Sequence, residues 1–282
     1  MHRQIGGGAA GTVFIVTRAE ERHDEGAERF ALKVPDYDAT AARSLSESDF
    51  LKLFREEAGA LLSIPEHENL AGFVTFDAGA RPKPILVMKL IDGTRCDKAI
   101  ASRILTLQSA FAMLDGVLSG LGAMHGVGVG HLDVKPSNII LRDRGQAVLV
   151  DFGLAGRHLR PGCGTSSYGA PEVWGIVPEG VSTTPMAADV YSFGCVAFEV
   201  LTGQTLFDAP NEVALISQHL THDGLPTGVK KLSDRPPTSG LAAVLRHCLR
   251  KDPRQRGSVA EIRTELHAVA SSLSGKSWPL PL

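Results

Sequence analysis

A short stretch near the middle of the chain, HLDVKPSNIIL at residues 131–141, gathers several polar side chains ahead of an apolar run. Asp133 could accept the proton of an attacking hydroxyl, and Lys135, on the same face of an extended loop, could screen charge on a transferring phosphoryl group. Asn138 offers an amide oxygen, a ligand that suits a hard cation. A polar turn with local hydrogen bonds would explain one such residue but not the whole spacing.

A second carboxylate follows at the end of the next apolar run. The segments NIILR and QAVLV, joined by the turn DRG, predict a hairpin, and the motif DFG at 151–153 comes directly after it. Asp151 is therefore expected beside the polar residues of 131–138, where its carboxylate would be the main Mg²⁺ ligand. Gly153 allows the backbone a sharp change of direction.

Lys33 lies in the predicted strand RFALKV, residues 29–34, and a helix is expected over 47–63. On that helix one stripe consists of Phe50, Phe54, Glu57 and Leu61. A carboxylate within an apolar stripe is costly unless it has a partner, and Lys33 is the natural one if the helix packs across the sheet. Glu56, one position off the stripe, is the competing partner, and a lone strand lysine usually points into solvent.

The glycine-rich segment IGGGAAGTV at residues 5–13 fits the pattern G-x-G-x-x-G-x-V. Glycines let backbone N–H groups approach phosphate oxygens closely. A glycine-rich hairpin turn explains the segment equally well, whereas a Rossmann loop would need a helix directly afterwards. Because TVFIV follows, the pattern predicts a flexible loop between two strands.

The elements that must position these residues fall into two regimes. Residues 1–92 contain strand-like runs around a single helix with Ser46 as its N-cap, and residues 100–273 are mostly helical. The second regime predicts helices near 109–125, 187–202, 211–221, 240–250 and 259–273, with Gly203 ending the second and a capping box at 258–261 opening the last. The proline and glycine content of 225–240 predicts a loop.

Composition excludes several classes of protein. The chain has 282 residues, of which 43% are apolar and 21% charged, with a net charge of -2. This balance disfavours a nucleic-acid surface or a polybasic membrane patch. The apolar run 190–201 is too short to span a membrane and contains Glu199, and MHRQIGGG is not a signal peptide. We expect a soluble, cytoplasmic protein with four free thiols, at Cys96, Cys163, Cys195 and Cys248.

Taken in order, these motifs resemble the signature set of the protein kinases, and specifically of the bacterial serine/threonine kinases of eukaryotic type. The set comprises Gly6–Val13, Lys33, Glu57, His131–Asn138, Asp151–Gly153 and Ala170–Glu172. Two further matches are Asp189, which in the family anchors the catalytic loop, and Arg256, which pairs with the residue equivalent to Glu172. The resemblance implies an α+β, two-lobed fold with a small lobe over 1–91, a large lobe over 92–273 and a tail over 274–282.

The resemblance also implies Mg-ATP-dependent transfer of the γ-phosphoryl group to Ser or Thr hydroxyls of protein substrates. The implied catalytic residues are Asp133, Lys135, Lys33, Glu57 and Thr165. Those around ATP are Ile5, Gly6, Gly7, Gly8, Gly11, Val13, Ala31, Lys33, Met88, Lys89, Ile91 and Ile140. Asn138 and Asp151 would hold Mg²⁺, and Leu61, His131 and Phe152 would stack in a column between the lobes.

One departure from the family pattern concerns regulation. The usual HRD triplet is HLD here, and Leu132 cannot bind a phosphate on the activation loop as the arginine does in many kinases. The loop segment 154–163 contains no Ser, Thr or Tyr, and the first hydroxyl is that of Thr165. We therefore hypothesise that activation-loop phosphorylation is not required. A pseudokinase scaffold and a small-molecule phosphotransferase remain the alternatives, and the oligomeric state is open.

Overall fold

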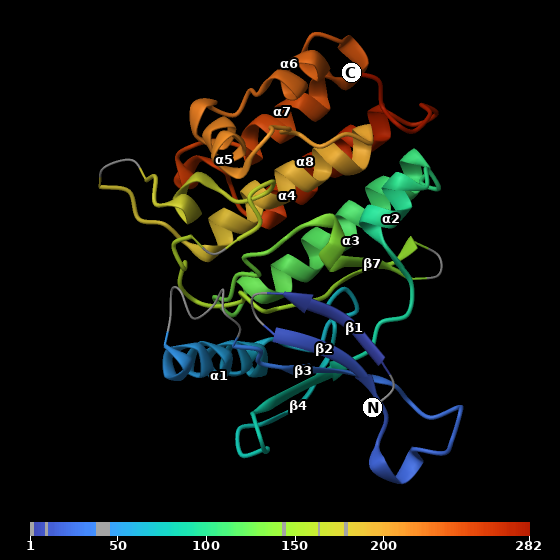
Figure 1. Ribbon diagram of the computed structural model, residues 1–282. Coiled ribbons are helices and arrows are strands. Elements are labelled where there is room, and N and C mark those ends of the chain that lie inside the picture. The colour runs from blue at the N-terminus through green and yellow to red at the C-terminus, as the bar shows by residue number, and fades with distance from the viewer. Residues whose placement is uncertain (1–2, 9–10, 38–45, 143–144, 163, 178–179) are drawn as a thin grey trace.

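Two lobes form the computed structural model, which describes residues 3–8, 11–37, 46–142, 145–162, 164–177 and 180–282. The small lobe contains a five-stranded sheet and one long helix, and the larger lobe is mainly helical (Figure 1). This is the two-lobed α+β fold expected from the sequence. The expected boundary near residue 91 falls between the strands β5 and β6.

The sheet of the small lobe is antiparallel, with its strands in the order β1-β2-β3-β5-β4. They are β1 (Arg3–Gly8), β2 (Gly11–Val16), β3 (Phe30–Val34), β4 (Phe73–Asp77) and β5 (Ile85–Lys89). The glycine-rich segment thus lies in two adjacent strands, β1 and β2, as expected, and the predicted loop at residues 9–10 lies outside the described residues. At Gly11 φ is +135°, and an added Cβ would lie 2.4 Å from the carbonyl oxygen of Val34, so only glycine fits there.

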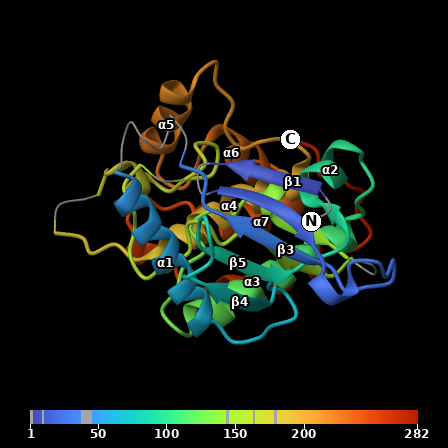
Figure 2. The ribbon, with the colours of Figure 1, turned by 60° about the horizontal axis from the view of Figure 1, so that its bottom comes forward.

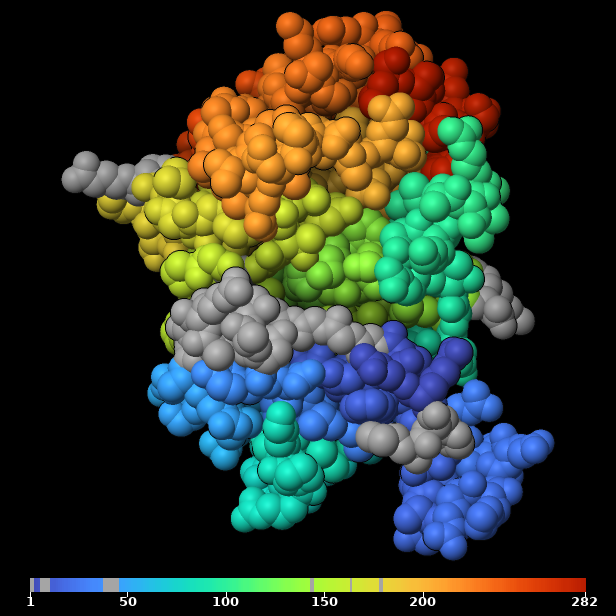
Figure 3. Space-filling model, in the orientation of Figure 1, coloured from blue at the N-terminus to red at the C-terminus, as the bar shows by residue number. Residues whose placement is uncertain are grey.

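An extended, charged turn projects from the small lobe between β2 and β3 (Figure 3). It contains the short 3-10 helix η1 (Ala19–Glu21). Arg18 pairs with Glu21 at 3.5 Å and with Glu28 at 3.3 Å, and its guanidinium lies over the ring of Phe30. Exposed ion pairs of this kind contribute at most about 1 kcal/mol to the free energy of unfolding, so the turn adds little to the stability of the lobe.

The helix of the small lobe, α1 (Glu47–Ser63), lies alongside the sheet (Figure 2). The side chain of Ser46 accepts a hydrogen bond from the backbone N–H of Asp49, so the predicted N-cap is confirmed. The predicted stripe is also confirmed, because it is buried along its whole length: Phe50, Phe54, Glu57 and Leu61. The helix therefore carries a carboxylate into the interior of the small lobe.

The large lobe is built around α3 (Leu107–His125) and α4 (Pro185–Thr202), whose apolar residues form much of the core. The other helices are α2 (Cys96–Ala101), α5 (Glu212–Thr221), α6 (Thr227–Ser233), α7 (Ser239–Cys248) and α8 (Val259–Ser272). Helix α3 is long and apolar enough to cross a bilayer, but it packs against α4, α8 and β8 inside the lobe. Its apolar character therefore fits a core helix.

A short three-stranded sheet, β6-β7-β8, lies where the lobes meet. Its strands are β6 (Thr94–Arg95), β7 (Ile139–Leu141) and β8 (Ala147–Leu149). The segment after α1 docks on this sheet, because Leu149 donates to the carbonyl of Asn69 and accepts from the N–H of Ala71. The amide of Asn69 also donates to the carbonyl of Ala147 at 2.7 Å. One end of β4 is thereby tied to the large lobe.

The tail after α8 packs back onto the end of α4. The indole N–H of Trp278 donates to the carbonyl of Val200 at 2.7 Å, and the N–H of Leu280 donates to that of Leu201 at 2.9 Å. These carbonyls belong to the last turn of α4, where partners within the helix are missing. The helix ends at Gly203 with φ 70°, as predicted.

The prediction of a loop over 225–240 is wrong, because this segment contains α6 and the start of α7. Val229 and Leu232 are fully buried and hold the short helix α6 in the core of the large lobe. Tertiary packing stabilises a helix that local proline and glycine content disfavours.

Two glycines of α3 test how closely the docked segment lies on that helix. At Gly120 an added Cβ would lie 3.0 Å from the carbonyl oxygen of Asn69 and 3.0 Å from Cδ2 of Leu70. We expect Gly120→Ala to lower the free energy of unfolding by roughly 1–3 kcal/mol. On the same helix Gly122 is the matched control, since its Cβ would meet no described atom within 4 Å. Gly122→Ala should gain up to about 1 kcal/mol. Urea denaturation measures both, and equal stabilisation would contradict the docking.

Candidate active site

An ion pair between β3 and α1 lies at the centre of the small lobe. Nζ of Lys33 donates to Oε1 of Glu57 at 2.8 Å, and both side chains are 2% exposed. Burial alone lowers the pKa of Lys33, but the carboxylates of Glu57 and Asp151 outweigh it, so this pKa is raised above its usual value. Lys33 therefore stays charged. The competing carboxylate, Glu56, points outward and lies 4.0 Å from Arg160.

Asp151 extends the same pair to the large lobe. Its Oδ1 lies 3.5 Å from Nζ of Lys33, and its backbone is left-handed, with φ 60°. Burial alone raises the pKa of Asp151, but Lys33, His131, Lys135 and the N–H of Gly153 together outweigh it, so this pKa is lowered and the carboxylate is ionised. The side chain of Asp151 is 47% exposed at the lobe junction, whereas those of Lys33 and Glu57 are each 2% exposed.

The carboxylate of Asp133 is held by three neighbours. Thr165 donates its hydroxyl to Oδ1 at 2.7 Å, and the ammonium group of Lys135 lies 2.7 Å from Oδ2. Lys135 also donates to the hydroxyl of Thr165 at 2.8 Å, so these side chains form a closed triangle. The amide nitrogen of Asn138 donates to Oδ2 at 3.0 Å. These contacts hold the carboxylate of Asp133 in one orientation, as a group that accepts a proton in a reaction requires.

The donor set fits Mg²⁺. Because the amide nitrogen of Asn138 is turned to Asp133, its amide oxygen remains to face a cation, and Asp151 supplies an ionised carboxylate. In the described part of the chain no three His, Cys, Asp or Glu side chains gather as a metal cage. A pair of protein oxygens completed by substrate phosphates and water is the coordination that Mg²⁺ accepts.

The loop that carries Asp133 is held in place by a buried carboxylate of α4. Asp189, with 0% exposure, accepts the backbone N–H groups of His131 and Leu132, both at 2.7 Å, and lies 2.9 Å from Nε2 of His125. Leu132 adopts the left-handed region, with φ 63°, and its side chain is 8% exposed. The hydrogen bonds to Asp189 therefore stabilise a strained backbone one residue before Asp133.

One other grouping expected from the resemblance is present, and two members of the expected column meet. The rings of His131 and Phe152 lie 5.3 Å apart, and both side chains are buried, as is Leu61. Arg256 forms a two-pronged pair with Glu172, with 2.8 Å between Nη2 and Oε2, deep in the large lobe. This pair ties the segment after Thr165 to the helices behind it.

The residues predicted to surround ATP come from several strands. Ile5, Gly6, Gly7 and Gly8 lie in β1, Gly11 and Val13 in β2, Ala31 in β3, Met88 and Lys89 in β5 and Ile140 in β7, and Ile91 follows β5. Cross-strand pairing places Val13 opposite Lys33 and Ala31 opposite Met88. The strands thus bring most of these residues close to Lys33, and their contacts with a nucleotide remain a prediction.

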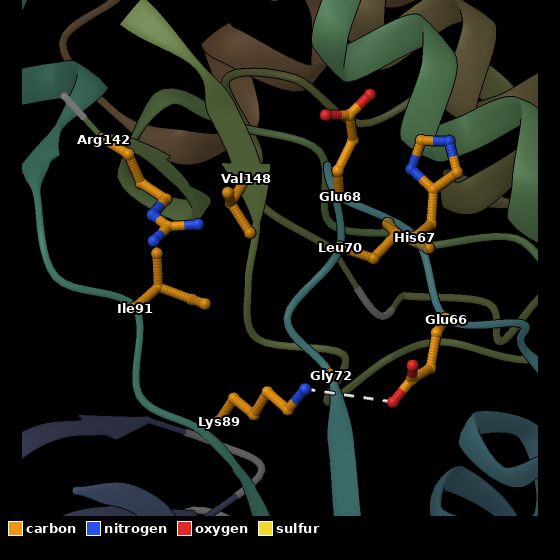
Figure 4. Close-up of a pocket in the computed structure, with 9 residues that line it drawn as sticks. All are labelled: Glu66, His67, Glu68, Leu70, Gly72, Lys89, Ile91, Arg142 and Val148. Carbon is orange, nitrogen blue, oxygen red and sulfur yellow. Dashed lines mark ion pairs between the residues drawn. The ribbon is translucent and has the colours of Figure 1, made fainter. Parts of the chain in front are cut away.

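A pocket of about 330 Å³ borders the connector between the lobes (Figure 4). Lys89 and Ile91 line it together with Leu70, Gly72 and Val148, and Nζ of Lys89 lies 3.9 Å from Glu66. Their side chains are therefore engaged on this side of the connector. A contact of 89–91 with a nucleotide, which the resemblance implies, would therefore come from the backbone and stays a prediction.

Sequence reasoning missed two arginines that follow the DFG motif. Arg157 donates to the carbonyl of Val127 at 2.6 Å and to the hydroxyl of Ser63, the last residue of α1, at 3.3 Å. Arg160 lies 4.0 Å from Glu56 of the same helix. Both arginines join the activation segment to α1. The sequence did contain a signal for these contacts, because Arg157 and Arg160 are charged residues in a segment, 154–163, that has no hydroxyl groups.

The choice between Glu56 and Glu57 can be tested by stability. Glu57→Gln removes the partner of a buried ammonium group, so we expect a loss of roughly 3 kcal/mol in the free energy of unfolding. Glu56→Gln is the matched control, because its carboxylate is exposed and should change stability by less than about 1 kcal/mol. Urea denaturation at neutral pH distinguishes them. Two small and equal losses would show that Lys33 does not depend on Glu57.

Comparisons with known proteins agree with this geometry. The model of the protein kinase domain matches residues 1–267. Among curated relatives, serine/threonine-protein kinase PknL of Mycobacterium bovis is 32% identical over 260 residues, which cover 89% of this chain and 61% of PknL. PkaA of Streptomyces coelicolor is 30% identical over 97% of this chain and 50% of PkaA. PknJ of Mycobacterium tuberculosis is 31% identical over 98% of this chain and 45% of PknJ.

The chain spans between 45% and 61% of the length of these relatives. The family model nevertheless covers both lobes, and the residues of its motifs meet at one site between them. On this evidence the chain belongs to the protein kinase family, as the resemblance in its sequence indicated.

Proposed function

We propose that this chain is a serine/threonine protein kinase that transfers the γ-phosphoryl group of Mg-ATP to hydroxyl groups of protein substrates. The observation that carries the proposal is the contact of Asp133 with Thr165, Lys135 and Asn138, at the same lobe junction where Lys33 meets Glu57 and Asp151. The relatives named above are serine/threonine-protein kinases, which supports the choice of substrate class.

Each of these side chains would act by position and charge. Lys33, held by Glu57, would bind the α- and β-phosphates, and Asn138 and Asp151 would hold Mg²⁺, which neutralises phosphate charge when bound. Asp133 would orient the acceptor hydroxyl and accept its proton, while Lys135 would screen the charge of the group in transfer. Thr165, bonded to both, would shape the place of the acceptor residue.

The alternatives make different demands on the site. A pseudokinase scaffold would be marked by loss of Lys33, Asp133 or Asp151, and all three are present and joined to partners. A small-molecule phosphotransferase would not need a docking segment for a polypeptide. Here Thr165 and the segment up to Glu172 are bound to the catalytic loop and to Arg256, which favours a protein substrate.

Asp133→Asn tests the proposed reaction. The amide cannot accept the hydroxyl proton, so we expect the turnover number for a Ser/Thr peptide mixture to fall by roughly 10²–10⁴. The melting temperature should stay close to that of the wild type, because the amide has the shape of the carboxylate. Asp97→Asn, on α2 and paired with Arg95, is the control and should keep full activity. Unchanged phosphorylation by Asp133→Asn would reject the assigned role.

We further propose that this kinase needs no phosphate on its activation segment. Many members of the family have at this position an arginine that binds such a phosphate, whereas Leu132 is apolar and buried in the core. Residues 154–163 also lack hydroxyl groups. Arg157 and Arg160 supply contacts from this segment to α1 without any modification. A cation beside Ser63 also suits the negative end of the α1 dipole.

Phosphate-free enzyme tests this part of the proposal. After expression with a protein phosphatase, and with mass spectrometry confirming unmodified 154–168, turnover should stay within about twofold of the untreated enzyme. Arg157→Ala should reduce turnover more than Arg22→Ala, a control in the projecting turn. Activity that appears only after phosphorylation of 154–168 would contradict the proposal.

The free, buried thiols of Cys96, Cys195 and Cys248 support a further proposal, that the domain works in a reducing, cytoplasmic environment.

A further inference from the structure

A buried chain of hydrogen bonds runs through the large lobe close to the segment that follows Thr165. The hydroxyl of Tyr191 in α4 lies 2.9 Å from Nδ1 of His219 in α5 and 2.9 Å from Nε2 of His222, which follows that helix. Tyr191 and His219 are completely buried, and the ring of Phe207 packs against both imidazoles. Burial lowers the pKa of each histidine to about 4, so both rings are neutral near pH 7.

One backbone N–H determines the donor and the acceptor in every hydrogen bond of this buried network. The N–H of Gly224 donates to Nδ1 of His222 at 3.1 Å, so this nitrogen carries no proton and the neutral ring must be protonated at Nε2. That Nε2–H donates to the hydroxyl oxygen of Tyr191. The single hydroxyl proton of Tyr191 then goes to the remaining acceptor, Nδ1 of His219. His219 therefore carries its own proton on Nε2.

The proton at the end of this chain lacks an acceptor. Nε2 of His219 is buried and makes no hydrogen bond to any residue that the structure describes. A buried donor without a partner destabilises the folded state. The backbone of Ser166 and Ser167 is close enough to raise the pKa of His219 against the larger effect of burial, and only carbonyl oxygens act in that direction. The backbone of Ser166 and Ser167 therefore lies near the ring of His219, and its carbonyl groups are the acceptors within reach that we assign to the free N–H.

These carbonyls belong to a turn whose first residue is part of the proposed active site. Thr165 binds Asp133 and Lys135, and its carbonyl accepts the N–H groups of Tyr168 and Gly169, both at 2.9 Å. On the other side, the hydroxyl of Ser192 in α4 donates to the carbonyl of Tyr168 at 2.9 Å. The turn is fixed at both of its ends, and the backbone of its two middle residues, Ser166 and Ser167, acts on His219.

We propose that His219 is a positioning residue for the protein substrate. Its Nε2–H would close onto a carbonyl of Ser166 or Ser167 when the acceptor segment binds beside Thr165, and this hydrogen bond would fix the turn in its productive conformation. The inference rests on the proposed kinase function. It predicts that changes at His219 alter the KM for the protein substrate and not the KM for ATP, because the groups assigned to ATP and Mg²⁺ belong to other elements.

Two substitutions of His219 test the roles of its two ring nitrogens separately. His219→Asn keeps an acceptor for Tyr191 at the position of Nδ1 but has no distal donor, whereas His219→Gln restores a distal N–H. We expect His219→Asn to raise the KM for a peptide substrate about tenfold, the worth of one hydrogen bond. The KM for ATP should stay within about twofold, and His219→Gln should lie close to the wild type. His267→Asn, at a largely exposed histidine of α8, is the matched control.

A purely structural role predicts other results. Equal peptide KM values for the Asn and Gln variants, or a parallel rise in the KM for ATP, would overturn the proposal.

The positions of the imidazole protons can be measured on the wild-type protein, with no variant and no activity assay. In ¹⁵N imidazole NMR spectra, His219 and His222 should both appear as neutral Nε2–H tautomers at pH 7. A proton on Nδ1 of His219 would overturn the proposal, whatever the variants do. If the wild type transfers no phosphate to any peptide, the proposed function fails, while the tautomers still decide whether the described hydrogen-bond chain exists.

Discussion

One buried ammonium group holds three parts of this molecule in register. Lys33 projects from β3, Glu57 from α1 and Asp151 from the start of the activation segment, and the two carboxylates lie 2.8 and 3.5 Å from the same Nζ. Charges with 2% exposure are tolerated only when they are paired, so the helix cannot rotate or move away without stranding one of them. Such a pair adds little net stability. Its main effect is to define where α1 and the large lobe stand relative to the sheet.

Local signals predicted most of the fold. The N-cap Ser46, the C-terminal Gly203 and the capping box of Ser258 with Glu261 each act within one or two turns of a helix, and each is found as expected. The helix α6 was missed because its stability comes from buried residues such as Val229 and not from its proline- and glycine-rich neighbourhood. The docking of Asn69 on β8 was also unpredictable, since it joins residues that are far apart in the chain.

The same distinction applies to the candidate site. The spacing of Asp133 and Asn138 within one loop was enough to foresee that they meet, and the stripe on α1 was enough to choose Glu57 over Glu56 as the partner of Lys33. No sequence pattern indicated that Lys33 also reaches Asp151, because that distance depends on how the lobes dock. The contacts of Arg157 with α1 and the ordered protons at His219 likewise exist only in the folded chain.

The docking of the segment around Asn69 has a mechanical consequence. Besides the side-chain contacts of Lys33, Arg157 and Arg160 between the lobes, the described backbone joins them through the hydrogen bonds of residues 69–71 to Leu149 and through the connector that follows Lys89. These backbone attachments limit how far the two lobes can shift relative to each other. The pocket beside Leu70 and Ile91 borders both attachments (Figure 4). A small molecule bound there would contact both attachments at once, at a distance from Lys33 and Asp151, which do not line this pocket.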